Sequence, residues 1–276
     1  GPTCDKRDNE QIPPIDEFKK FAELGFAGMT IPEKYGGQKL DDISEAIVVE
    51  ELSRVDPSLG VMIAVHVGLC SMTIALSGNE EQKEKYLPKL ASGEFLGAYS
   101  LSEAGSGTDA AAMVARAADD GDYYTLNGEK MWVTNGTTAD LFVLFAKVTD
   151  HPDYGKKSHG GVTCFIIEKG FEGFEIGKKE DKLGIRSSDT CTLILNDCKV
   201  PKANVLGEVG KGFPIAMNAL DNSRIGIAAQ GLGIAQGAYE TALKYSKERE
   251  TFGKPIAAHQ SCLLYTSPSP RDPWKS

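Results

Sequence analysis

Residues 101–109, with the sequence LSEAGSGTD, combine hydroxyl side chains with small residues in one short segment. The hydroxyls of Ser102 and Thr108 can hydrogen-bond the edge of a ring or a phosphate. Gly105 and Gly107 carry no Cβ, so the backbone between the two hydroxyls can approach a ligand closely. The segment therefore has the composition of a loop that wraps a phosphate-bearing ligand.

A second segment, residues 130–136 (KMWVTNG), places an indole ring two residues before another hydroxyl. On an extended strand, side chains at positions i and i+2 lie on the same face, so Trp132 and Thr134 can touch one ligand. A flat aromatic wall beside a hydrogen-bond donor suits a planar heterocycle. Together, the two segments predict a flavin cradle.

Taken alone, residues 101–109 could equally form an ordinary turn, because loops rich in serine and glycine are common. They do not match the dinucleotide-binding fingerprint, since a third glycine after Gly107 is missing and no strand-turn-helix unit with a downstream acid follows. The second segment is what favours a functional interpretation of the first.

The composition is that of an ordinary globular protein. The 276 residues are 41% hydrophobic and 25% charged, and the formal net charge is −9. This negative charge argues against non-specific nucleic-acid binding, which depends on basic patches. The longest apolar stretches, residues 61–67 and 225–229, are far shorter than the roughly 20 residues that cross a bilayer. The sequence therefore predicts no nucleic-acid partner and no membrane span.

The six cysteines are scattered and form no CxxC pair, which favours buried free thiols over a metal site or a set of disulfides. The amino terminus is polar and lacks a secretory signal. Both features favour a reducing compartment. We expect a bacterial cytoplasm, or the mitochondrial matrix for a eukaryotic source.

Three regions differ in their residue patterning. Residues 1–94 carry apolar side chains near the helical period. Residues 95–206 change to short β-rich runs separated by turns, which is typical of a small barrel or sandwich. Residues 207–261 return to a helical pattern. Helices, then strands, then helices predict a segregated α+β architecture rather than a doubly wound sheet.

Local signals predict where several elements begin and end. Helices are expected to start at Asp41 or Asp42, at Pro57 and after Asn79. One long helix is expected over residues 212–249, and its glycines require close helix packing. Strands are expected at residues 123–126, 141–148, 161–167 and 190–195, with turns at residues 119–122 and 127–128.

The two segments resemble those of the acyl-CoA dehydrogenase family, flavoenzymes that oxidise acyl-CoA thioesters between the α and β carbons. The resemblance extends along nearly the whole chain to about Ser261, and residues 177–236 are most similar to the short-chain, butyryl-type branch. It implies an amino-terminal α-helical domain, a middle β-barrel and the start of a carboxy-terminal four-helix bundle. The further matching motifs are residues 31–37 (IPEKYGG), 177–186 (GKKEDKLGIR), 220–224 (LDNSR) and 249–254 (RETFGK).

The resemblance also implies which residues hold the cofactor, FAD. Ser102 would lie at the pyrimidine end of the flavin ring, and Thr108 near the pyrophosphate and the CoA moiety. Trp132 would flank the isoalloxazine, and Thr134 would donate to N5, where a donor stabilises the charge that arrives with the hydride. The implied cofactor-binding residues are Tyr99, Leu101, Ser102, Gly107, Thr108, Trp132, Val133 and Thr134, with Arg249, Thr251, Phe252 and Gln260 reaching the FAD of a neighbouring subunit.

The implied substrate-binding residues are Thr108, Asp221, Ser223 and Arg224. Asp221 and Arg224 occupy positions where the family contacts the pantetheine or adenosine part of CoA. Without the resemblance, Arg249 would be interpreted as a cation at a helix end and Phe252 as a core residue. No metal site is expected.

The reaction needs a base that removes the α proton of the thioester while hydride leaves the β carbon. A carboxylate in a desolvated pocket suits this role, because loss of water raises its proton affinity. In the short-chain branch the base is a glutamate near the carboxy terminus, and nothing after Gln260 resembles that segment. In the isovaleryl branch its position is occupied here by Ser223, which cannot replace a carboxylate. Glu103 belongs to the flavin loop, so no catalytic residue is expected in this chain.

Residues 262–276 leave the family pattern abruptly and place two prolines where a helix should run. Residues 262–272 match, codon by codon, the translation of a transposon-end sequencing adaptor. We therefore expect natural sequence to stop near Ser261, with a disordered Pro/Ser tail as the alternative. Since Gly1 is not a start methionine, the chain is expected to be a fragment from a microbial source.

The sequence thus predicts FAD-dependent α,β-dehydrogenation of a short-chain acyl-CoA to the 2-enoyl-CoA. In the intact homotetramer, electrons would pass to an electron-transferring flavoprotein, whereas this chain alone should lack turnover. The alternatives are an acyl-CoA oxidase or another flavin oxidase of the same fold, and a non-catalytic structural or interaction protein.

Overall fold

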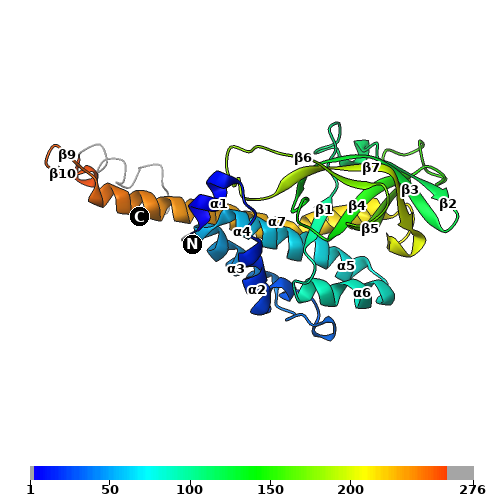
Figure 1. Ribbon diagram of the computed structural model, residues 1–276, viewed down its shortest axis with the longest axis horizontal. Coiled ribbons are helices and arrows are strands. Elements are labelled where there is room, and N and C mark those ends of the chain that lie inside the picture. Colours follow the sequence, from blue (N-terminus) through cyan, green and yellow to red (C-terminus); the bar gives the residue numbers. More distant parts are fainter. Residues whose placement is uncertain (1–2, 260–276) are drawn as a thin grey trace, which may run out of the picture.

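The computed structural model describes residues 3–259, which form a group of helices beside a sheet, with one long helix spanning both (Figure 1). This helix, α7 (Gly212–Glu248), begins against the sheet, passes the amino-terminal helices and projects beyond them. It contacts strand β5 (Val162–Glu168) as well as the helices α4 (Pro57–Ala64) and η3 (Val65–Ser71). Side chains of the sheet and of the helices therefore meet along the first turns of α7.

The amino-terminal helices begin where the sequence predicts. Asp41 caps α3 by accepting a hydrogen bond from the backbone N of Ser44 at 2.8 Å, and Pro57 is the first residue of α4. Asn79 and Gln82 form a reciprocal capping box at the start of α6. The elements of this region are α1 (Cys4–Glu10), α2 (Ile15–Glu23), η1 (Phe26–Gly28), η2 (Glu33–Tyr35), α3 (Asp42–Val55), α4 (Pro57–Ala64), the π-helix η3 (Val65–Ser71), α5 (Met72–Ser77) and α6 (Glu80–Ala91).

The elements α4, η3 and α5 form one helix over Pro57–Ser77, which is long and apolar enough to cross a membrane, with a mean hydropathy of 2.1. The sequence expectation that every apolar stretch is too short is therefore wrong, because the helix extends beyond residues 61–67 at both ends and continues through Gly68 and Ser71. In the fold, 78% of this apolar segment is buried, and η3 contacts strand β1 and α7. The core helix of a globular protein has the same length and hydropathy, so the segment is accounted for by packing.

The middle region is an eight-stranded sheet in the order β6-β7-β3-β2-β4-β5-β8, with β1 paired to β4. Most neighbours are antiparallel, whereas β1 and β2 each pair with β4 in parallel. The prediction of a strand over residues 141–148 is confirmed, but β1, β2 and β6 were not expected. The strands are β1 (Gly97–Ser100), β2 (Arg116–Asp120), β3 (Tyr123–Thr134), β4 (Leu141–Val148), β5 (Val162–Glu168), β6 (Phe174–Lys179), β7 (Thr190–Pro201) and β8 (Val205–Leu206), and short 3-10 turns lie at η4 (Ala110–Ala112) and η5 (Lys202–Asn204).

The turn predicted at residues 127–128 is wrong. Both residues lie inside β3, where the register against β7 shifts between Leu126 and Gly128. Gly128 has a φ of +143°, and a Cβ there would lie 2.9 Å from the Cα of Ala115. The glycine therefore permits a bulge and a close backbone approach, which local sequence cannot distinguish from a turn.

The long helix α7 is confirmed, and part of its glycine content is explained by packing against α3. A Cβ at Gly233 would lie 2.2 Å from the carbonyl oxygen of Glu50, and a Cβ at Gly237 would lie 2.2 Å from that of Arg54. A Cβ at Gly231 would meet only open space among the residues that the structure describes, so close packing does not explain that glycine. After α7 the chain forms a small hairpin of β9 (Glu250–Thr251) and β10 (Lys254–Pro255), followed by η6 (Ile256–Ala258).

Candidate functional site

One cavity, with a volume of about 450 Å³, brings the two predicted segments together. Both segments contribute side chains, and the opposite walls come from η3, β1 and the first turns of α7. Its lining residues are Val65, Leu69, Tyr99, Leu101, Ser102, Gly107, Thr108, Ala110, Met131, Trp132, Thr134, Met217, Leu220 and Arg224. Of the sequence-predicted residues in the two segments, only Val133 does not line this cavity.

The strand that carries Trp132 is not regularly extended. The register between β3 and β7 shifts between Lys130 and Val133, and Trp132 itself has a φ of +56°. This left-handed conformation is unusual for a bulky residue and indicates a locally constrained backbone. As a result Met131, Trp132 and Thr134 all line the cavity, whereas Val133 is buried in the core. Trp132 and Thr134 therefore do line the same cavity, as predicted, but a bulge in β3 places them there rather than the regular alternation of a strand.

Two polar residues that the sequence analysis missed hold the backbone after Thr134. The side-chain Nδ2 of Asn135 donates to the carbonyl oxygens of Met62 and Gly97, both at 3.1 Å, and so links β3 to α4 and β1. The Oδ2 of Asp189 accepts hydrogen bonds from the backbone N atoms of Thr137 and Thr138, at 2.7 and 2.9 Å, and from both hydroxyls.

Asn135 and its partners are far apart in the sequence, as are Asp189 and the two threonines. The Asn-Gly dipeptide at residues 135–136 is the one local signal that the backbone turns there.

The hydroxyls that face the cavity are available to a ligand. Ser102 and Thr134 are half-buried and Thr108 is exposed. Within residues 3–259, none of these three hydroxyls makes a side-chain hydrogen bond to the protein. Trp132 also lines the cavity and is 60% exposed. A flat wall with three uncommitted hydroxyls fits a planar heterocycle with polar edges, so the residues present fit a flavin.

The charge around the cavity is sparse. Arg224 is the charged residue among those that line it, and its Nε bonds the Oδ1 of Asp221 at 3.2 Å. Among the described residues, no Asp or Glu lines the cavity, and no cluster of three His, Cys, Asp or Glu side chains could hold a metal ion. Glu103 is buried and faces away from the cavity, into an ion pair with Lys130.

Of the residues predicted to bind the substrate, Thr108 lines the cavity from the loop, and the other three lie on one stretch of α7 but have different contacts. Arg224 lines the cavity, and Asp221 reaches its rim through the bond to Arg224. The hydroxyl of Ser223 instead donates to the carbonyl oxygen of Leu220 at 3.1 Å, and its side chain does not line the cavity.

The residues predicted to reach a neighbouring subunit lie at the far end of α7. Arg249 follows Arg224 by 25 residues, which corresponds to about 37 Å along a helix. Thr251 bonds His259 at 3.0 Å between Oγ1 and Nε2, and the side chain of Phe252 is 97% exposed. These residues therefore cannot contribute to the cavity of their own chain. Gln260 lies outside the described residues, as do residues 262–276.

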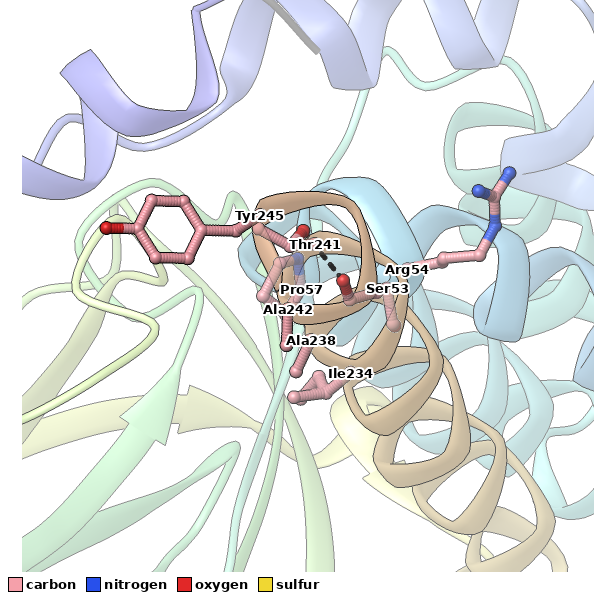
Figure 2. Close-up of a pocket in the computed structure, with 9 residues that line it drawn as sticks. Ser53, Arg54, Pro57, Ile234, Ala238, Thr241, Ala242 and Tyr245 are labelled. Atoms are coloured by element: carbon pink, nitrogen blue, oxygen red, sulfur yellow. Dashed lines mark hydrogen bonds between the residues drawn. The ribbon is translucent and has the colours of Figure 1, made fainter. Parts of the chain in front are cut away.

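A second hollow, with a volume of about 540 Å³, lies between the α3–α4 junction and the distal part of α7 (Figure 2). Its lining is mainly aliphatic, and Figure 2 shows Arg54 and Tyr245 pointing away from it on opposite sides. Arg54 is already paired with Glu51 and Glu240. Among the described residues, no sequence-predicted site residue lines this hollow.

Comparison with known families gives one consistent match along the chain. Profiles for the acyl-CoA dehydrogenase N-terminal, middle and C-terminal domains match residues 1–94, 98–198 and 210–264, respectively. The chain is 49% identical to a short-chain specific acyl-CoA dehydrogenase of Clostridium acetobutylicum over 247 residues, which are 90% of this chain and 64% of that protein. The chain thus spans less than two thirds of the length of this relative.

Solved structures give the same match. Butyryl-CoA dehydrogenase from Megasphaera elsdenii superposes with a TM-score of 0.89 at 44% identity, covering 95% of this chain and 68% of that one. A chain in a structure described as the electron transferring flavoprotein of Acidaminococcus fermentans gives a TM-score of 0.90 at 48% identity, with the same coverage. An acyl-CoA dehydrogenase from Bacillus anthracis complexed with FAD gives 0.85 at 40% identity, covering 93% of this chain and 44% of that one.

Proposed function

Because the chain belongs to the acyl-CoA dehydrogenase family, we propose that the cavity between residues 101–108 and 131–134 holds FAD and an acyl-CoA thioester. The parent protein would catalyse α,β-dehydrogenation of a short-chain acyl-CoA to the 2-enoyl-CoA. The observation that carries this proposal is the convergence of the indole of Trp132 and three uncommitted hydroxyls, those of Ser102, Thr108 and Thr134, on one cavity.

Each of these residues has a distinct part in the proposal. The indole of Trp132 stacks against the ring and fixes its plane, while the hydroxyl of Thr134 donates to the ring edge. Ser102 and Thr108 hold the polar parts of the cofactor and of CoA. When bound, FAD supplies the hydride acceptor. The related Bacillus anthracis protein complexed with FAD supports the choice of cofactor.

The substrate would be a short-chain acyl-CoA that contacts α7. The names of the Clostridium and Megasphaera relatives support a short-chain substrate. Arg224 would contact the pantetheine or adenosine part of CoA, with Asp221 orienting its guanidinium. Since no carboxylate among the described residues lines the cavity, we propose that this chain alone does not remove the α proton and does not turn over.

The distal end of α7 would serve a second subunit. Arg249, Thr251 and Phe252 are too far from their own cavity, so we propose that they contact the FAD of a neighbouring copy in a homo-oligomer, a tetramer in the intact protein. Electrons would pass to an electron-transferring flavoprotein, for which the Acidaminococcus structure is support. A bacterial cytoplasmic location fits the bacterial relatives.

The proposal is tested by titrating the purified chain with FAD and following flavin fluorescence. We expect binding that Thr134→Val weakens about tenfold, the effect of one lost hydrogen bond to a ligand. Thr125→Val, on the same strand but outside the cavity, is the matched control and should leave the Kd unchanged.

Butyryl-CoA is then added to the flavin-loaded chain with an artificial electron acceptor. Steady turnover would contradict the expected lack of a base. A reduced flavin that reacts quickly with oxygen would indicate an oxidase, and no flavin binding at all would indicate a structural protein.

A further inference from the structure

Lys130 is a lysine without any contact with solvent. Its side chain is 0% exposed, and its Nζ donates to the Oε1 of Glu103 at 2.7 Å and to the carbonyl oxygen of Leu101 at 3.0 Å. Lysine is almost never fully buried unless it is paired. Burial lowers the pKa of the Lys130 ammonium, and the neighbouring Glu103 carboxylate opposes that shift. The position is therefore built around this one ion pair.

Glu103 is equally committed. Its side chain is 4% exposed, and its carboxylate accepts hydrogen bonds from the backbone N of Val114 at 2.6 Å and of Ala115 at 3.1 Å. With Lys130, three donors from two separate segments converge on it. Such a set compensates much of the cost of burying a carboxylate.

The pair joins the two segments that line the cavity. Leu101 and Glu103 flank Ser102, and Lys130 precedes Met131, whose backbone N donates to the carbonyl oxygen of Ser102 at 2.9 Å. Three hydrogen bonds thus fix the loop to the strand directly behind the cavity wall. Lys130 also lies where the bulge that carries Trp132 begins.

We propose that Glu103 and Lys130 are positioning residues that set the distance between the hydroxyl of Ser102 and the bulge of Trp132 before any ligand binds. This inference rests on the proposed flavin site. An apolar pair of similar volume can fill the same space and is often neutral for stability. Such an apolar pair cannot fix the orientation of the loop and its register against the strand as a charged, hydrogen-bonded pair does. When both charges are removed together, the free energy of unfolding should therefore stay near that of wild type, whereas the geometry of the bound ligand should change.

The test compares Lys130→Met with the double variant Glu103→Gln/Lys130→Met. The single variant leaves a buried carboxylate unpaired and should unfold at lower denaturant concentration. The double variant should recover most of that stability. Its Kd for FAD should nevertheless stay about tenfold above wild type, because the two walls lose their fixed spacing. The visible circular dichroism of the bound flavin should change as well.

The control is the pair of Lys85 and Glu168, whose Nζ and Oε1 are also 2.7 Å apart but which joins α6 to β5 and touches neither of the two cavity-lining segments. The variant Lys85→Met/Glu168→Gln should leave the Kd and the dichroism unchanged. If the Glu103→Gln/Lys130→Met variant binds FAD as wild type does, with the same spectrum, the pair is structural only and the inference is wrong.

A wild-type chain that takes up no FAD would instead contradict the proposed function. The positioning role is then decided in the ligand-free protein from the fluorescence of Trp132, measured in a Trp274→Phe background. The double variant at Glu103 and Lys130 should shift the emission maximum and lower the anisotropy, and the control pair should not. Unchanged fluorescence in all variants overturns the inference.

Discussion

Two buried glutamates, Glu103 in the loop beside the sheet and Glu45 on α3, have different surroundings in the fold. Glu103, on the sheet side, accepts hydrogen bonds from Val114 and Ala115 and pairs with Lys130. Glu45, on α3, is also buried, but the described residues offer it neither a hydrogen-bond donor nor a cation. The carboxylate of Glu103 therefore has partners for its buried charge. The carboxyl group of Glu45 has none among the described residues, and its burial favours the neutral form.

The surroundings of Glu45 explain this difference. Its Oε1 lies 3.0 Å from where a Cβ of Gly68 would be and 3.5 Å from that of Gly226, so two glycines make room for the carboxyl group between η3 and α7. Burial, with a smaller contribution from the negative charge of Asp42, raises the pKa of Glu45 to about 7. The two glycines give the Glu45 carboxyl group space but no hydrogen-bond donor, whereas the Glu103 carboxylate has three donors around it.

The largest expected effect on stability is at Glu103, the glutamate with hydrogen-bond donors and a paired lysine. Glu103→Gln should destabilise the protein by about 3 kcal/mol at pH 7, because the Lys130 ammonium stays buried without a counter-charge. Denaturant unfolding followed by far-ultraviolet circular dichroism measures this. An unfolding free energy within about 0.5 kcal/mol of wild type would mean that the pair contributes little, contrary to the comparison.

The same substitution at Glu45, which lacks such partners, should change the free energy of unfolding in the opposite direction. The pKa of Glu45 is raised from 4.5 to about 7, so ionisation favours the unfolded state and stability falls as the pH rises from 4.5 through 7. Glu45→Gln removes this loss and should stabilise the protein by roughly 2 to 3 kcal/mol at pH 8, with little change at pH 4. A variant that is less stable than wild type at pH 8 would contradict the assignment.

A second buried group among the helices, His66, should make stability depend on pH in the opposite direction to Glu45. Its Nδ1 accepts from the backbone N of Gly97 and its Nε2 lies 3.2 Å from the carbonyl oxygen of Leu90. Burial lowers the pKa of His66 from 6.5 to about 4, so stability is lost as the pH falls from 6.5 toward 4. Over this window Glu45 and His66 act in opposite directions, and their contributions to the pH profile partly cancel.

The cancellation is checked by comparing slopes rather than absolute stabilities. In Glu45→Gln, acidification from pH 7 to 4.5 should cost stability, because the contribution of His66 is no longer offset. In His66→Gln, the lost hydrogen bonds lower stability at every pH, but acidification over the same window should increase it. If stability changed with pH in the same way in both variants, groups other than Glu45 and His66 would control stability in this pH range, and the prediction would be wrong.

The smallest effect is expected at the distal end of α7. Phe252 is 97% exposed, so Phe252→Ala should change the unfolding free energy by less than about 0.5 kcal/mol. In a monomeric sample it should also leave FAD binding unchanged, since Phe252 follows the end of α7, where Arg249 is about 37 Å along the helix from Arg224 of the cavity wall. Weaker FAD binding that appears only in an oligomeric sample would support the proposed contact with a neighbouring subunit.

Much of the fold follows from local signals. The caps at Asp41 and Asn79, the start of α4 at Pro57 and the strand Leu141–Val148 are all where the sequence predicts them. Each depends on a side chain acting on its own backbone or on a run of β-forming residues. Strand β2 was missed because its sequence, RAADD, has no β-branched or aromatic residue and is held by its neighbours β3 and β4.

The sequence by itself determined the family resemblance, the order of helices and strands, and the two segments that line the cavity, because these depend on residue type and short spacing. Tertiary structure alone decided the bulge at Trp132, the anchors Asn135 and Asp189, and the different surroundings of Glu45 and Glu103. Each of these depends on groups brought close from distant parts of the chain, as Lys130 is to Glu103 across 27 residues. Whether a buried polar group has such a partner is fixed only when the chain folds.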